Sequence, residues 1–139
     1  MKLRLELADY GVVATAVLYE HAAPRVSRLV YASLEQALDT HTRHACFDGQ
    51  EVYCFLPPFP EEPPLEFAAT MDERLSGGNP AVHELAIMYG EVDLRHYWEE
   101  GFHGSLVGRI DEGLEAFASA CGQTLSDGRT RLRVSQEER

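Results

Sequence analysis

The sequence predicts a mainly β fold: a closed or nearly closed antiparallel barrel of about eight short strands, capped by two α-helices. Most apolar runs are short, alternate with polar residues or are β-branched, and end at turns that contain glycine or proline. Only two segments show the apolar spacing of a helix. One follows the first strand pair, and the other precedes the last strand.

The first two strands are expected at residues 2–7 and 12–19. In residues 2–7 three leucines alternate with charged side chains, a pattern typical of a half-buried strand. Residues 12–19 are apolar or β-branched on both faces, which suits a barrel wall covered on the outside by a helix. A turn at residues 9–11 makes these two strands a hairpin.

The first helix is expected to start at Pro24 and to run to about Thr40, because apolar residues recur there at helical spacing. Residues 43–56 then predict a hairpin around Asp48-Gly49, a strong two-residue turn signal.

Five of the seven prolines fall within residues 57–64, which is too dense for a central strand. This stretch is either a plain surface loop or the rim of a pocket. A short strand is expected after it, near residues 65–69.

The second half of the chain predicts strands at residues 83–89 and 101–110. A short helix is expected from Glu112 to Cys121, and Gly122 is expected to end it in the left-handed conformation. The last strand ends at Val134.

The chain of 139 residues fits one domain, residues 1–134, followed by a frayed tail at residues 135–139. The net charge of -11 repels phosphates, so nucleic acids and anionic membranes are poor partners. No apolar run approaches the ~20 residues of a membrane span. Three cysteines without zinc spacing and no signal-peptide core predict a cytoplasmic protein with reduced thiols.

Two segments resemble cyclophilins. Residues 15–26 (TAVLYEHAAPRV) are similar to the cyclophilin segment in which a strand passes through an acidic residue and A-P-K-T into the first helix. Residues 106–115 (LVGRIDEGLE) are similar to the signature F-G-K-V-V-E-G-M/L-D, where a strand turns into the second helix. The resemblance implies a cyclophilin-like barrel. The middle of the chain lacks the arginine with which cyclophilins polarise the prolyl peptide bond.

The middle of the chain resembles small bacterial cyclophilin-like families of unknown function, in particular the DUF3830 type. There an H-A-x-W-x-G-E-x-V-W hairpin follows the first helix, and E-x-x-x-x-Y-G comes later. Residues 44–53 (HACFDGQEVY) and the stretch from Glu84 to Tyr89-Gly90 match, with Phe47 in place of the first tryptophan. Related domains occur in enzymes that open cyclic amides such as oxoproline, which is an analogy of fold and not of function.

Three residues are candidates for catalysis. His44 and Cys46 lie two apart on a predicted strand, so their side chains are expected on one face, where an imidazole can activate a thiol to attack a carbonyl. The alternative is a buried cysteine beside a hydrogen-bonded histidine. Glu84 is a candidate to bind a ring N–H group or to act as a general base, or else is a solvated strand residue.

Trp98 and His103 are candidates to bind the ligand, because aromatic and acidic loop residues can line pockets for planar or cationic molecules. Phe47 and Tyr89, which lie in the two segments that resemble the DUF3830 type, are further candidates. Alternatively, Trp98 belongs to a hydrophobic plug or an oligomer contact. No metal site is expected, because the nearby histidines and cysteine lack further ligands. No cofactor is expected, because the chain has neither a phosphate loop nor a dinucleotide fingerprint.

The sequence thus indicates a barrel that binds a small molecule. If it is an enzyme, the expected activity is hydrolysis of a cyclic amide or a similar carbonyl compound. Two alternatives stay open. One is a module that binds or isomerises prolyl peptides, and the other is a non-catalytic subunit whose acidic surface contacts a protein partner or a second copy.

Overall fold

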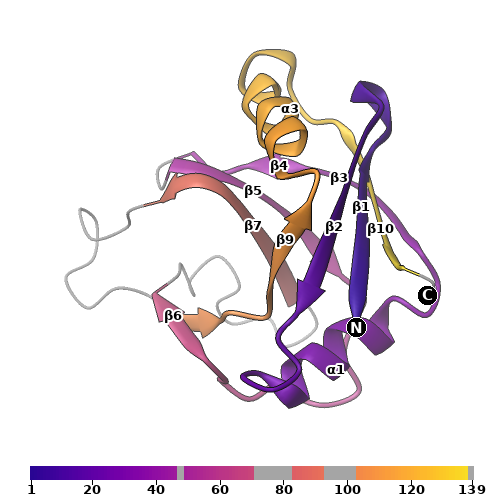
Figure 1. Cartoon of the computed structure of the whole chain (residues 1–139), viewed down its shortest axis with the longest axis vertical. Coiled ribbons are helices and arrows are strands. Elements are labelled where there is room, and N and C mark those ends of the chain that lie inside the picture. Colours follow the sequence, from indigo (N-terminus) through magenta and orange to yellow (C-terminus); the bar gives the residue numbers. More distant parts are fainter. Residues whose placement is uncertain (47–48, 71–82, 93–102, 138–139) are drawn as a thin grey trace.

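The computed structural model describes residues 1–46, 49–70, 83–92 and 103–137. In these residues the chain forms ten strands, one short 3₁₀ helix and two α-helices, so the fold is mainly β (Figure 1). The elements are, in order, β1 (Lys2–Leu7), η1 (Ala8–Tyr10), β2 (Val12–Leu18), α1 (Pro24–Ser33), β3 (Leu38–His41), β4 (Arg43–His44), β5 (Gly49–Leu56), β6 (Ala68–Thr70), β7 (His83–Val92), β8 (His103–Ser105), β9 (Gly108–Glu112), α3 (Leu114–Asp127) and β10 (Arg131–Gln136).

A five-stranded antiparallel sheet in the order β3-β10-β1-β2-β9 forms one side of the molecule. The predicted alternation in β1 is confirmed, since Leu3, Leu5 and Leu7 are buried and the charged residues between them are not. Leu5 lies opposite Ala14 on one side and Val134 on the other, so three strands share one apolar inner face.

A three-stranded sheet in the order β4-β5-β7 supplies the opposite side of the core. Its inner face carries Val52, Cys54 and Leu56, all buried in the same core cluster as the leucines of β1. The chain passes between the two sheets at Thr42, whose N–H donates to the Thr130 carbonyl (2.9 Å). Strands β6 and β8 form a separate two-stranded ladder.

The two helices lie at opposite ends of the long strands (Figure 1). Helix α1 buries Val26, Leu29 and Val30. Helix α3 buries Phe117 and Cys121, which are fully inaccessible to solvent. None of the helices in the described ranges is long and apolar enough to cross a membrane.

The described strands do not complete the closed barrel that the sequence predicts. The ladders form three separate sheets, and within the described ranges no ladder joins β7, at the edge of the smaller sheet, to β9, at the edge of the larger one. The two sheets therefore enclose a core that is open between these two strands.

The first helix is shorter than predicted. It ends at Ser33 and not near Thr40, and residues 38–41 instead form β3. Leu38 pairs with Val134 and His41 with Arg131, so this segment hydrogen-bonds the edge of β10. The stabilisation from pairing with β10 is larger than that from continuing the helix, although the apolar residues of this segment have helical spacing.

The second helix starts later and ends later than predicted. Gly113 precedes its first residue in the left-handed conformation, and Gly122 lies inside the helix. A glycine inside a helix costs roughly 0.5–1 kcal/mol. The helix nevertheless continues past Gly122, and Thr124, two residues further on, is buried. The helix ends at Asp127, before Gly128.

Three strand predictions also need correction. Residues 101–110 were expected as one strand, but the chain forms β8 and β9, with Leu106 bonded to the Phe67 carbonyl between them. Strand β7 continues past Gly90 to Val92. Strand β10 continues past Val134 to Gln136, which pairs with Leu3 in the large sheet.

Candidate functional site

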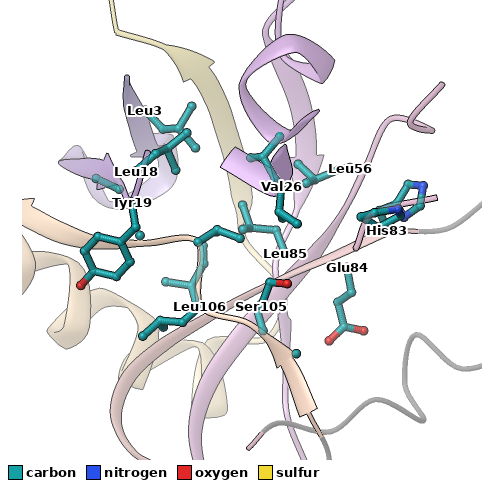
Figure 2. Close-up of a pocket in the computed structure, with 18 of the residues that line it drawn as sticks. Leu3, Leu18, Tyr19, Val26, Leu56, His83, Glu84, Leu85, Ser105 and Leu106 are labelled. Carbon is teal, nitrogen blue, oxygen red and sulfur yellow. The ribbon is translucent and has the colours of Figure 1, made fainter. Parts of the chain in front are cut away.

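A cavity of about 750 Å³ lies between the two sheets, at the opening between β7 and β9. Its floor consists of side chains that belong to the apolar core, from both sheets and from α1. The following apolar residues line it: Leu3, Leu18, Val26, Leu56, Leu85 and Ile87 (Figure 2). These strands and α1 thus position apolar side chains around an internal space.

Polar side chains occur at the margin of the cavity: Tyr19, Glu62, His83, Glu84, Ser105 and Arg109. They come from four separate parts of the chain, and the strand ends and loops around the opening bring them together. The cavity therefore combines an apolar floor with a polar margin, the arrangement that is common in small-molecule sites.

His83 and Phe59 form a flat stack at this margin. Their ring centroids lie 4.0 Å apart and their planes differ by 9°. Burial lowers the pKa of His83 below its ordinary value, which favours the neutral imidazole. The stack gives the cavity a planar aromatic wall with a neutral hydrogen-bonding edge.

The proline-rich segment, residues 57–67, forms one wall of the cavity. Phe59, Glu62, Pro63, Pro64 and Leu65 all line it. Of the two interpretations that the proline cluster allows, the structure therefore supports the pocket rim. The prolines fix the backbone of this wall. Each proline restricts its own φ angle and keeps the residue before it out of the helical conformation.

Glu84 lines the same cavity at the edge strand β7. It lies opposite Phe55, on the outer face of the small sheet, and its carboxylate extends away from Leu85 and Leu56 (Figure 2). Burial, together with the negative charge of Glu84, raises the pKa of Tyr53 on that face. Glu84 thus contributes to the margin of the cavity, and its carboxylate does not point into the apolar floor.

His44 and Tyr89 contact each other, but neither lines the cavity. The His44 Nδ1–H donates to the Ala45 carbonyl (2.8 Å), so Nε2 accepts the hydrogen bond from the Tyr89 hydroxyl (2.5 Å). Burial raises the pKa of Tyr89. This pair joins β4 to the far end of β7.

His44 and Glu84 lie on opposite faces of the small sheet. His44 pairs with Val52, whereas Glu84 pairs with Phe55, and positions an odd number of residues apart on one strand face opposite ways. Cys46 follows the end of β4 and is exposed. The structure therefore does not bring the three candidates for catalysis together in the cavity.

The remaining candidates are less informative. Phe47 and Trp98 lie outside the described residues, and His103 is the first residue of β8. Three residues that no sequence pattern marks as site residues also line the cavity: Tyr19, His83 and Ser105. Their only signal in the sequence was proximity to the segments that resemble cyclophilins and to Glu84.

The comparisons with known proteins agree with this architecture. A solved structure of McbB in complex with tryptophan matches with a TM-score of 0.68 and 17% sequence identity, over 99% of this chain and 45% of that chain. The present chain thus spans less than half the length of McbB, and at this level of identity the likeness is one of fold. No curated protein matches the sequence significantly.

The sequence matches one family model, described as a protein of unknown function (DUF3830), over residues 5–136. The match covers both sheets and both helices that surround the cavity. The chain therefore belongs to the DUF3830 family.

Proposed function

We propose that this protein binds a small, largely apolar molecule in the cavity between its sheets, with an N–H group of the ligand at the polar margin. The cavity itself carries the proposal. Its volume of about 750 Å³ falls within the range of roughly 300–1,000 Å³ that is common for small-molecule sites. Its lining is apolar on both sheets, which favours a ligand that loses little hydration on entry.

The margin favours a ligand with a hydrogen-bond donor. Glu84 supplies a carboxylate that can accept an N–H bond, and the neutral His83 ring offers a second hydrogen-bonding group. The net charge of -11 disfavours anionic ligands. The similar McbB structure was solved with tryptophan, a molecule with an aromatic ring and N–H groups, and this supports the same ligand class here.

A thermal-shift screen tests the proposal. The panel contains indole, tryptamine, tryptophan, oxoproline, hydantoin, benzoate and one proline tetrapeptide. A ligand at ~100 times its dissociation constant adds roughly 2.7 kcal/mol to the free energy of unfolding, which raises the melting temperature by several degrees. We expect a shift with indole, with the aromatic amines or with the uncharged cyclic amide hydantoin, and none with the anion benzoate.

A matched pair of variants locates the binding. Leu85→Trp places a large side chain on the cavity wall, whereas Leu125→Trp makes the same change at an exposed position of α3. Only Leu85→Trp should abolish the shift, provided that circular dichroism shows it folded. A shift that survives in folded Leu85→Trp would place the ligand elsewhere. No shift with any compound would favour the interpretation as a non-catalytic docking subunit.

A second candidate function is hydrolysis of a cyclic amide, favoured by the carboxylate at the cavity margin. Glu84 would take a proton from a water molecule while the water oxygen bonds to the amide carbonyl carbon. The C–N bond then breaks, and the proton passes to the ring nitrogen. His44 does not line the cavity, which leaves Glu84 as the candidate base of the three proposed for catalysis.

Turnover of oxoproline and hydantoin, measured as ring opening, tests this second candidate. Glu84→Gln should abolish turnover and leave the melting temperature within a few degrees of the wild type, because the two side chains have nearly the same shape. Glu62→Gln, at another part of the same margin, is the control and should keep full activity. Turnover that survives in Glu84→Gln would rule out Glu84 as the base.

A further inference from the structure

Helix α1 has no N-cap of its own. Ala23 occupies the N-cap position without a side-chain hydrogen bond, and the first turn holds no acidic residue. Pro24, at the first helical position, has no N–H group. The N–H groups of Arg25 and Val26 lack acceptors inside the helix because they lie in its first turn. Helix N-terminal donors of this kind are satisfied by water or by an acceptor side chain, which can come from another part of the chain.

Glu66 supplies that acceptor from 40 residues further along the chain. Its Oε2 accepts hydrogen bonds from the N–H of Arg25 (2.8 Å) and of Val26 (3.0 Å). A negative charge at this end of a helix is also favoured by the helix dipole. The distant carboxylate thus replaces the missing local cap.

The same residue joins the proline-rich segment to the opposite wall of the cavity. The Glu66 N–H donates to the Ser105 hydroxyl (3.0 Å), which in turn donates to the Pro64 carbonyl (3.3 Å). The next residue, Phe67, accepts a bond from the Leu106 N–H (3.2 Å). Figure 1 shows this segment passing α1 on its way to β6.

These contacts are concentrated at one end of the segment. Five prolines between Leu56 and Glu66 have no N–H group, so they cannot donate backbone hydrogen bonds to the protein. They also make the segment stiff, so that a displacement at Glu66 is transmitted along it. Phe59 and Glu62, nearer its start, line the cavity.

We propose that Glu66 is a positioning residue that holds the proline-rich segment across the cavity and thereby controls how fast a ligand enters and leaves. This inference rests on the proposed function, because it concerns access to the same cavity. Breaking the two bonds to α1 frees the wall that Phe59 and Glu62 help to form. The bound ligand and the α1 cap are coupled, since Val26 both lines the cavity and donates to Glu66.

Two measurements on Glu66→Ala test the proposal. In stopped-flow experiments with the apolar fluorophore Nile red, both the association and the dissociation rates should rise about tenfold, an effect of the size that loss of a helix N-cap produces. In hydrogen-exchange experiments the amides of Glu66 and Leu106 should exchange faster by a similar factor. The dissociation constant should change less than either rate, because opening accelerates both directions.

Glu61→Ala is the matched control. Glu61 lies in the same segment and forms an exposed ion pair with the Arg25 side chain (3.4 Å), but it does not bond to the helix N–H groups. Its removal should leave the rates and the exchange near those of the wild type. Glu66→Gln keeps an acceptor oxygen without the charge, so its rates should lie between those of wild type and Glu66→Ala.

The outcomes are distinguishable. If folded Glu66→Ala keeps wild-type Nile red rates and wild-type exchange, Glu66 does not hold the segment and the proposal is wrong. If Glu61→Ala raises the Nile red rates as much as Glu66→Ala does, a general charge effect explains the faster rates, and the proposal is again wrong. If Glu66→Ala does not fold, Glu66→Gln decides by the same criteria. If the wild type binds no Nile red, the exchange data still decide the role of Glu66, and the failure falls on the proposed function.

Discussion

The geometry at Gly113 predicts how much stability the protein loses when this glycine is replaced by alanine. It connects β9 to α3 at a φ of +76°, and a Cβ atom there would lie 2.5 Å from the Val13 carbonyl oxygen. Gly11 has a similar φ of +63°, but a Cβ atom there would meet nothing within 4 Å. Replacing each by alanine therefore separates the cost of the left-handed backbone from the cost of the clash.

The left-handed conformation costs a residue with a Cβ roughly 1–2 kcal/mol, and the less flexible unfolded chain returns roughly 0.4–1 kcal/mol. Gly11→Ala should therefore lower the free energy of unfolding by about 1 kcal/mol. Gly113→Ala must also move the β2 backbone, which adds roughly 1–3 kcal/mol, a cost comparable to overpacking a core.

Urea denaturation followed by circular dichroism measures both variants. We expect Gly113→Ala to lose about 2–4 kcal/mol in all, two or more times the loss in Gly11→Ala. Equal losses in the two variants would show that the contact with Val13 does not limit this position. That result would refute the steric explanation of the glycine in the I-D-E-G-L motif.

Two further predictions concern titrating groups. Burial raises the pKa of both Cys54 and Cys121 to about 12, whereas Cys46 is exposed, so iodoacetamide at pH 8 should label only Cys46 until the protein unfolds. Mass spectrometry of labelled peptides checks this, and labelling of Cys54 in the native protein would contradict it. Hydrogen bonds from Arg131 hold the pKa of Asp9 well below its ordinary 3.8, so this carboxylate stabilises the fold above that pH and stabilises it progressively less as the pH falls. Asp9→Asn should lower the urea midpoint slightly at neutral pH, and the difference from the wild type should shrink in acid; a difference that grows in acid would contradict the assignment.

Local sequence patterns predicted the elements whose stabilisation is local. The leucine alternation of β1, the hairpin with β2, and the place of each helix in the chain order are confirmed. The glycine of the cyclophilin-like signature is Gly113, and the left-handed turn between β9 and α3 explains why a glycine stands there. In these cases the periodicity and the turn residues carry the information without knowledge of the tertiary structure.

Features that depend on distant pairing were not predictable from one sequence. The end of α1 is set by Leu38 and its neighbours pairing with β10, nearly 100 residues further along the chain. The separation of His44 from Glu84 depends on the register of three strands, because a shift of one residue would exchange the two faces. The role of Glu66 likewise follows only from its contact with α1.

The way in which the two sheets are joined has a consequence for the width of the cavity. In the described residues the sheets are joined by continuous backbone at Thr42, whereas between β7 and β9 they are separated by side chains and cavity. In a closed barrel the interior width is fixed by strand number and shear. Here side chains such as Leu85 and Ile110 line the space between the sheets, so substitutions at these positions can change the width of the cavity without changing the hydrogen-bonded framework.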